Sequence, residues 1–209
     1  MSGDLIGVTQ IYGTYGQASG DSAFAALKTD GSVVTWGTSW MGGDSSTVSV
    51  GLSSGVTQIY PGGFAFAALK ADGSVVTWGA SGSGGDSSAV SDDLTSGVTQ
   101  IYPGSFAFAA LKANGSVVTW GASWGGGDSS AVASQLTSGV TQIYSNSRAF
   151  AALKDDGSVV TWGWSFTVGG GGDGNVVSPD LSSGITQIYS TGSAFAALKD
   201  DGAVVTWGN

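Results

Sequence analysis

Five near-copies of one phrase make up almost the whole chain. The phrase reads V-T-Q-I-Y, a short loop, A-F-A-A-L-K, a D-G or N-G pair, and S-V-V-T-W-G, and its tryptophans stand 42, 42, 42 and 45 residues apart. A fixed period in this range is typical of supersecondary units that stack into a solenoid, a propeller or an array. We therefore expect a single domain over residues 1–209, with repeat cores at 8–37, 56–79, 98–121, 140–163 and 185–208.

Each repeat has the composition of β-strands. V-T-Q-I-Y and S-V-V-T-W are rich in β-branched and aromatic residues, which favour strands. A-F-A-A-L-K is too short for a stable helix, and its alanines would let a neighbouring sheet approach closely, so it is predicted to be a central strand. The D-G and N-G pairs predict two-residue hairpin turns, in which both residues need positive φ.

A fourth strand is predicted after each W-G, where a glycine-rich loop leads into D-S-S-x-V. Four antiparallel strands in about 42 residues is the size of a propeller blade. The sequence thus predicts an all-β propeller of five repeats, with the repeated tryptophans wedged between blades. The fifth repeat stops at W-G-N, so its blade is expected to be incomplete. Closure within one chain, closure between chains and membership of a larger propeller all stay open.

The composition argues against several classes of partner. Six Lys and Arg stand against fifteen Asp, which gives a net charge of −9. The lysines recur once per repeat rather than clustering, so no basic surface for nucleic acid is expected. No apolar run is long enough for a membrane span, and the first residues do not resemble a signal peptide. The compartment, extracellular or cytoplasmic, is left open.

Catalytic arrangements are hard to build from this chain, which contains no His, Cys or Glu. Triads that use Ser–His–Asp or Cys–His are therefore excluded. The paired aspartates Asp92-Asp93, Asp155-Asp156 and Asp200-Asp201 are better explained as solvated loops than as a glycosidase pair. We expect a protein that is not an enzyme and needs no cofactor.

One recurring aspartate suggests a weak hypothesis of metal binding. It follows the glycines of each loop and precedes two serines in the first three copies, and Asp with Ser and backbone carbonyls can bind hard cations. The alternative is that its carboxylate caps the turn that follows. We expect no metal site, and the weak candidates are Asp44, Asp86, Asp128 and Asp173.

Residues 96–121, S-G-V-T-Q-I-Y-P-G-S-F-A-F-A-A-L-K-A-N-G-S-V-V-T-W-G, resemble the repeat of the regulator of chromosome condensation family. The compact spacing and the S-G-V lead-in look still more like the bacterial propeller-type β-lactamase inhibitor proteins. The resemblance extends from about Gly7 to Gly208 and implies a β-propeller, commonly of seven blades. It carries over no exchange-factor or inhibitor residue, because no matching functional motif stands in this chain.

The variable loops are the most informative feature for function. Loops after V-T-Q-I-Y and after W-G are expected at the same face of the propeller, whereas the D-G turns and S-G linkers, which hardly vary, are expected at the other. Aromatic residues in loops on a rigid scaffold are typical of binding sites, although such residues can also pack over outer strands. The segment from Tyr12 to Phe24 belongs to the expected face, and the candidate binding residues are Trp40, Met41, Phe64, Phe106, Trp124, Arg148, Trp164 and Phe166.

Three functions remain open from the sequence. The first is a non-enzymatic protein-binding or scaffold propeller. The second is a lectin-like propeller that binds a glycan through Trp with Asp, Asn and Ser. The third is a consensus or engineered repeat protein without a native ligand, suggested by copies 56–79 and 98–121, which differ only at Gly63/Ser105 and Asp72/Asn114. Oligomers could form through the incomplete last blade.

Overall fold

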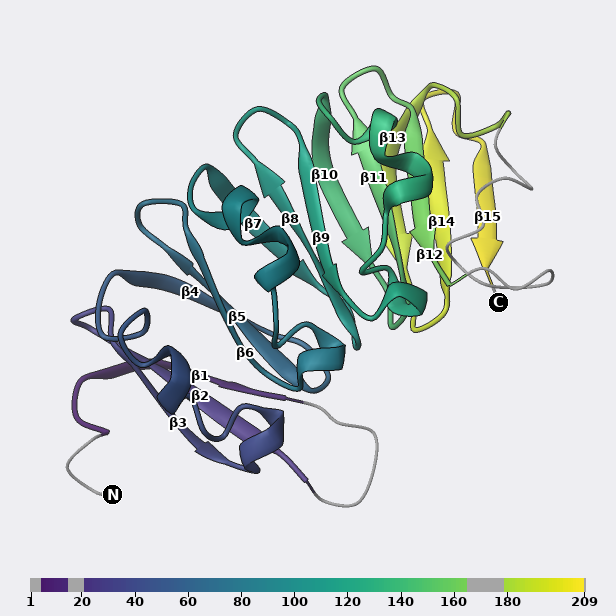
Figure 1. Ribbon diagram of the computed structural model, residues 1–209. Helices are drawn as coiled ribbons and strands as arrows, with labels where there is room; N and C mark the ends of the chain where they lie inside the picture. Colours follow the sequence, from purple (N-terminus) through teal and green to yellow (C-terminus); the bar gives the residue numbers. More distant parts are fainter. Residues whose placement is uncertain (1–4, 15–20, 165–178, 209) are drawn as a thin grey trace.

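The computed structural model describes residues 5–14, 21–164 and 179–208. These residues form five antiparallel three-stranded sheets, one per repeat, which stack face to face along an arc (Figure 1). We call the sheets blades 1 to 5. The strands are β1 Val8–Gly13, β2 Ala23–Lys28, β3 Val33–Gly37, β4 Val56–Pro61, β5 Ala65–Lys70, β6 Val75–Gly79, β7 Val98–Pro103, β8 Ala107–Lys112, β9 Val117–Gly121, β10 Val140–Ser145, β11 Ala149–Lys154, β12 Val159–Gly163, β13 Ile185–Ser190, β14 Ala194–Lys199 and β15 Val204–Gly208.

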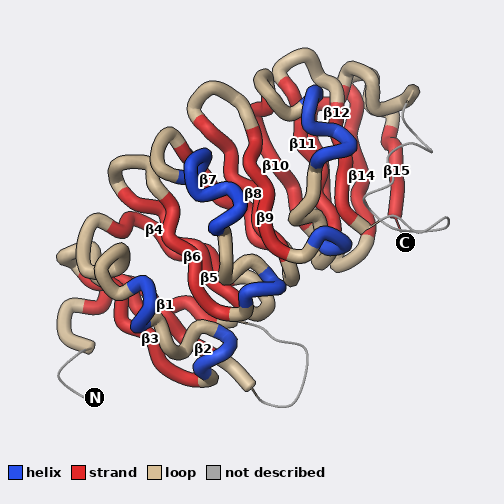
Figure 2. The backbone as a smooth tube through the Cα atoms, viewed as in Figure 1, coloured by secondary structure: helices blue, strands red, loops and turns tan. Residues whose placement is uncertain are grey.

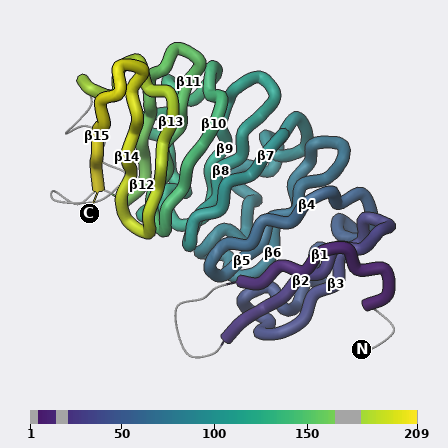
Figure 3. Tube along the Cα trace, turned by 180° about the vertical axis from the view of Figure 1, so that it is seen from behind, coloured from purple at the N-terminus to yellow at the C-terminus, as the bar shows by residue number. Residues whose placement is uncertain are grey.

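The A-F-A-A-L-K phrase forms the central strand of every blade, as the sequence predicted. Its first two alanines face the next sheet and its third faces the preceding one, and Ala25, Ala67 and Ala109 are fully buried. The five-repeat, all-β propeller fold is thereby confirmed. Figures 1 and 3 place blades 1 and 5 at opposite ends of the arc, so the described residues form an open row of blades.

The predicted fourth strand is wrong. The D-S-S-x-V segments fold into 3-10 helices, η2 Ser46–Val48, η4 Ser88–Leu94 and η6 Ser130–Gln135, drawn in blue in Figure 2. An aspartate begins each turn, because the Oδ1 atoms of Asp44, Asp86 and Asp128 accept the backbone N–H two residues later at 2.9 Å. This side-chain bond competes with strand pairing. The sequence also predicted that the fifth blade would have fewer strands than the others. This prediction is wrong, because every blade has three strands.

The 3-10 segments act as spacers on one side of the stack. The first strands of neighbouring blades approach one another, while η4 packs against β9 and η6 against β12. From these segments Val90 and Leu94 join the core between blades 2 and 3. The blades therefore fan apart from their first strands to their third, which gives the stack its curvature.

The repeated tryptophans of blades 2 to 5 lie between blades, as expected, whereas Trp36 of blade 1 belongs to none of the four cores between blades. Trp78, Trp120 and Trp162 are buried and stack on a phenylalanine of the same blade, with ring centroids 5.1–5.4 Å apart. The indole Nε1 of each donates a hydrogen bond of 3.0–3.1 Å to a glycine carbonyl after the preceding W-G. Each of these tryptophans thus packs against the preceding blade and, through its hydrogen bond, sets the distance between the two blades.

The hairpin turns contain three residues rather than the two that were predicted. In blade 1 the Gly31 N–H donates to the Lys28 carbonyl, and the Lys28 N–H donates to the Ser32 carbonyl, both at 3.0 Å. Gly31 has φ of +75°, which closes the loop as a glycine bulge does. The aspartate before the glycine, Asp30, accepts hydrogen bonds from the backbone N–H and the hydroxyl of Ser32.

Candidate functional site

One edge of the stack gathers the variable loops. The ladder of blade 1 pairs Gly13 with Phe24 and Ala23 with Gly37, so the loop after the first strand and the loop after W-G leave the sheet together. The same register recurs in all five blades. We call this the W-G edge, toward which the arrows of β9, β12 and β15 point in Figure 1. The opposite D-G edge carries the hairpin turns and linkers.

A continuous row of aromatic rings runs along the W-G edge. Centroid distances between consecutive rings are 5.8 Å for Trp40–Phe64, 5.3 Å for Phe64–Phe106, 4.6 Å for Phe106–Trp124 and 5.9 Å for Trp124–Trp164. These separations lie within the range of favourable aromatic pairs. We call these five residues the aromatic row, and they come from the loops of four blades.

The row combines three positions of the repeat, and Trp164 stands directly after W-G in blade 4. Phe64 and Phe106 stand directly before the second strand, whereas Trp40 and Trp124 lie in the short 3-10 helices η1 Ser39–Met41 and η5 Ser123–Gly125 after W-G. Trp40 is 54% exposed and Trp124 is 46% exposed. In η3, Ser81–Ser83, Gly82 replaces the tryptophan, and a side chain there would meet open space.

Arg148 closes one end of the row. It occupies in blade 4 the position of Phe64 and Phe106, and its guanidinium carbon lies 4.7 Å from the ring centroid of Trp164 and 5.7 Å from that of Trp124. Cations over aromatic faces at these distances are attracted by the ring quadrupole. The side chain is exposed, so the row presents one positive charge beside its apolar rings.

Asn146 holds the loop that carries Arg148, a role that the sequence analysis missed. Its Oδ1 accepts the backbone N–H of Arg148 at 2.9 Å and of Ala149 at 2.8 Å. The amide is buried. The signal available in the sequence was the replacement of glycine, present at Gly62 and Gly104, by asparagine at this position.

Backbone hydrogen bonds join the loops beneath the row. The N–H of Gly63 donates to the Ser105 carbonyl at 3.1 Å, Ser105 N–H to Ser147 O at 3.1 Å, and Ser147 N–H to Gly192 O at 3.3 Å. One loop in each of blades 2 to 5 is thus tied to the next. The aromatic side chains stand on a platform that is already ordered before anything binds.

Two other predicted binding residues, Met41 and Phe166, are not part of the aromatic row. Met41 is fully buried in the core between blades 1 and 2, and its inclusion as a surface contact is wrong. Its neighbour Trp40 points outward because the two adjacent positions of η1 face opposite ways. Phe166 lies outside the described residues, as do parts of the segment from Tyr12 to Phe24.

The candidate metal ligands are engaged in turns. Hydrogen bonds from the backbone N–H and side chain of the serine two residues later lower the pKa values of Asp44, Asp86 and Asp128 below the usual range. Across residues 5–14, 21–164 and 179–208, no three side chains of the metal-ligating types cluster. Asp173 lies outside these ranges. The capping interpretation therefore accounts for the three described aspartates.

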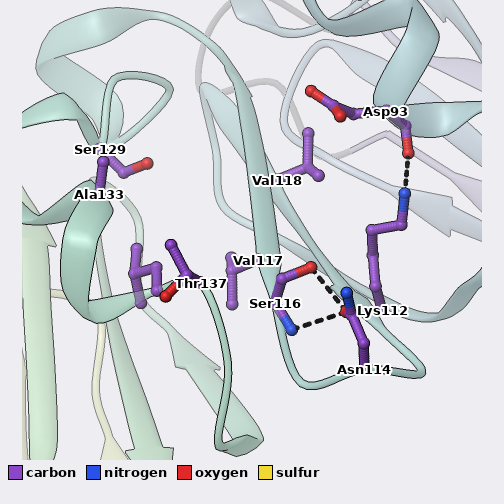
Figure 4. A pocket seen from close by; sticks show the side chains of 10 residues that line it. Asp93, Lys112, Asn114, Ser116, Val117, Val118, Ser129, Ala133 and Thr137 are labelled. Carbon is purple, nitrogen blue, oxygen red and sulfur yellow. Dashed lines mark hydrogen bonds between the residues drawn. The ribbon is translucent and has the colours of Figure 1, made fainter.

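A groove of about 380 Å³ lies toward the D-G edge, between blade 3 and the 3-10 segments (Figure 4). Its lysine, Lys112, donates from Nζ to the Asp93 carbonyl at 2.6 Å. Its asparagine, Asn114, accepts the Ser116 N–H at 3.0 Å and the Ser116 hydroxyl at 2.7 Å. The equivalent lysine in blade 5, Lys199, donates to the Asp180 carbonyl. The polar groups of this groove thus serve the framework of the repeat.

The comparisons with known proteins bear on the fold. No protein-family model matches the chain, and no curated protein matches it. Among solved structures, human WBSCR16 is 21% identical with a TM-score of 0.52, over 96% of this chain and 61% of that one. Yeast RCC1 (Prp20) bound to Kap60 is 18% identical with a TM-score of 0.55, over 98% of this chain and 56% of that one.

The chain has the fold of an RCC1-type β-propeller. A further similar structure is the CRINKLY WD40 ectodomain of the Arabidopsis thaliana receptor kinase ACR4, 18% identical with a TM-score of 0.55, over 97% of this chain and 68% of that one. The propeller described here spans less than two thirds of the length of WBSCR16 and of yeast RCC1. The likeness to β-lactamase inhibitor proteins stays a prediction from the sequence. No helix among the described residues is long and apolar enough to cross a membrane.

Proposed function

We propose that this propeller is a non-enzymatic protein-binding scaffold whose contact surface is the aromatic row with Arg148. The observation that carries the proposal is the unbroken contact of five aromatic rings across four blades, with two tryptophans about half exposed. Exposed aromatic residues and arginine are the residue types that dominate the energetics of protein interfaces.

The rigidity of the platform supports this function. Binding costs free energy when loops and side chains must be ordered. In this protein the backbone hydrogen bonds between neighbouring loops and the contacts between rings already order the loops and side chains before a partner binds. A partner segment with apolar side chains, and an acidic group placed to meet Arg148, fits the row best.

Proteins of the same fold support the class of partner. One similar structure is yeast RCC1 (Prp20) in complex with the protein Kap60, and another study of Prp20p concerns its binding to Gsp1p and histones. Those partners belong to those proteins. They support the narrower point that propellers of this type present surfaces to other proteins.

A peptide-display selection tests the proposal. The wild-type protein is used as bait, and the enriched peptides are then measured against both the wild type and a Trp40→Ala, Phe106→Ala, Trp124→Ala variant. The expected result is a set of enriched peptides that share apolar or aromatic residues and lose binding to the triple variant. Enriched peptides that bind the triple variant equally well would place the contact surface elsewhere.

Glycan binding is the second candidate, favoured by the exposure of the two indole faces of Trp40 and Trp124. Sugars commonly stack on such faces. A glycan array probed with the wild-type protein and with Trp124→Ala distinguishes the two candidates. Reproducible sugar binding that Trp124→Ala abolishes, with no peptide enriched, supports the lectin. Failure of both screens supports a repeat protein without a native ligand.

A further inference from the structure

The junctions between consecutive blades share one chemistry. In the first junction, Tyr12, Ala25 and Leu27 of blade 1 pack against Ile59, Phe66 and Trp78 of blade 2. The same repeat positions form the other three junctions. Every blade therefore has a leading face, which carries the isoleucine, phenylalanine and tryptophan, and a trailing face, which carries the tyrosine, the small residues and the first valine of the third strand.

No described segment of the chain covers the leading face of blade 1. Ile11 is 61% exposed, whereas its equivalents Ile59, Ile101, Ile143 and Ile188 are 1–2% exposed. Phe24 is 38% exposed, whereas the equivalent phenylalanines of blades 2 to 5 are 0–2% exposed. Trp36 still stacks on Phe24 at 5.5 Å, so the face has the shape of an interior leading face without its neighbour.

The trailing face of blade 5 is likewise free of contacts from a further blade within residues 5–14, 21–164 and 179–208. Val204 is 62% exposed and Tyr189 is 55% exposed, whereas the equivalent Val33 and Tyr12 pack in the first junction. Ala196 is partly exposed, although Ala25, Ala67, Ala109 and Ala151 at the same position are fully buried. Figures 1 and 3 show these two faces at opposite ends of the arc.

Polar groups of the junctions are also repeated at the two ends. The N–H of Val56, Val98, Val140 and Ile185 each donates at 2.9–3.1 Å to the carbonyl of the turn glycine in the preceding blade. The corresponding donor of blade 1 is the Val8 N–H, and the corresponding acceptor of blade 5 is the Gly202 carbonyl. The two ends thus match in hydrogen bonding as well as in shape.

We propose that the trailing face of blade 5 in one molecule packs on the leading face of blade 1 in a second copy of this chain, as a continuation of the interior junctions. A second copy is the occupant that the structure favours, because the chain itself already covers this type of face four times with these side chains. The contact is head-to-tail, so it closes into a ring or continues as a filament according to the rotation per molecule.

Two variants, each with one face blocked, test the proposal. Ile11→Arg places a charge on the leading face and Val204→Arg on the trailing face, and both positions are exposed, so folding is retained. The matched control is Val50→Arg, at a valine that is 87% exposed in the turn between η2 and β4, outside both faces. Circular dichroism and thermal unfolding verify that all variants are folded.

The readout is the mass in solution by sedimentation as a function of protein concentration. We expect the wild type and Val50→Arg to form species larger than one 20.6 kDa chain, and each blocked variant alone to remain monomeric. An equimolar mixture of the two blocked variants should form a dimer and no larger species, because one intact face of each kind remains. The dissociation constant for self-association of the wild type should be at least about tenfold lower than that for any self-association of either blocked variant.

Three results would overturn the proposal. The wild type remains monomeric at all concentrations, or the mixed variants do not pair, or Val50→Arg dissociates the assembly as strongly as the blocked variants. In the first case the exposed faces belong to other repeats or to a different protein. Peptide binding at the aromatic row is measured separately, so its loss or survival does not decide this test.

Discussion

The two edges of the blades contrast in what their side chains do. At the D-G edge, aspartate or asparagine, glycine and lysine recur in each blade and serine follows the glycine in blades 1 to 4. The aspartate accepts hydrogen bonds from that serine within the turn, as Asp72 and Ser74 show. At the W-G edge, the residues before the second strand change from phenylalanine to arginine to serine, and the rings contact one another across blades. One edge maintains the fold, and the other is free to vary.

The largest expected difference in stability is between alanine variants of two phenylalanines that stand two residues apart. Phe108 is fully buried and stacks on Trp120, whereas Phe106 belongs to the aromatic row. We expect Phe108→Ala to lower the free energy of unfolding by about 3–5 kcal/mol. Phe106→Ala should cost less than about 1.5 kcal/mol, because the side chain is only partly buried. Urea unfolding of both variants measures the difference, and equal losses would remove the distinction between row and core.

Glycine substitutions give the next largest effect. Gly115 at the D-G edge has φ of +76°, and an added Cβ would lie 2.8 Å from the backbone nitrogen of Gly139. Gly115→Ala should therefore destabilise by at least about 1–2 kcal/mol. Gly82→Ala at the W-G edge meets open space without a positive φ and should leave stability within about 1 kcal/mol of the wild type. Thermal unfolding of the pair would contradict the contrast if Gly82→Ala were the more harmful change.

Arg148 provides a smaller effect within the row. Arg148→Gln removes the cation from the faces of Trp124 and Trp164, which should cost about 0.5–1 kcal/mol at this exposed site. Arg148→Lys keeps the charge without the planar group and serves as the matched control. Chemical unfolding measures the stability of both, and tryptophan fluorescence reports the change around the rings. No change in either readout for Arg148→Gln would show that the contact contributes nothing.

The smallest expected effect is on how the stability of the protein depends on pH through an aspartate at the D-G edge. Hydrogen bonds from the Ser74 side chain and backbone lower the pKa of Asp72 from 3.8. A carboxylate whose pKa is lowered by folding stabilises the protein above its unfolded pKa and loses that contribution as the pH falls. Asn114 accepts the same two bonds without titrating.

Asp72→Asn copies Asn114 into blade 2 and should leave stability at neutral pH nearly unchanged. It should reduce the loss of stability as the pH falls through and below about 3.8. Thermal unfolding across this range, with Ser74→Ala as the comparison, measures it. A larger acid sensitivity in Asp72→Asn than in the wild type would contradict the assigned role.

The sequence predicted much of the framework because its signals are local and repeated. β-branched residues at Val75 and Val76 and the alanines of A-F-A-A-L-K predicted three strands correctly. The fourth strand failed because the Asx turn at Asp86 satisfies the backbone locally and outweighs the weak strand propensity of D-S-S-A-V. The predicted length of the hairpin turns was wrong because the D-G pair alone does not show that the residue before it also belongs to the loop.

For the candidate site, the residue types were predictable and their arrangement was not. Loop aromatics such as Trp124 stood out from the repeat, but the contact between Phe64 and Phe106 depends on the spacing of neighbouring blades. Met41 was misassigned because sequence adjacency to Trp40 does not say which way a residue of a 3-10 turn points. The exposure of Ile11 depends on which segment packs against its face of blade 1, and the residues of its own repeat do not reveal that.

The most direct test of the account is the affinity of a display-selected peptide for Phe106→Ala, measured together with the unfolding free energy of that variant. Asn114→Ala at the D-G edge is the control for the opposite edge. The account predicts at least about a tenfold loss of peptide affinity in Phe106→Ala, with stability close to the wild type and no affinity change in Asn114→Ala. Unchanged affinity in Phe106→Ala, or a loss of stability as large as that of Phe108→Ala, would contradict the assignment of the W-G edge as the binding surface.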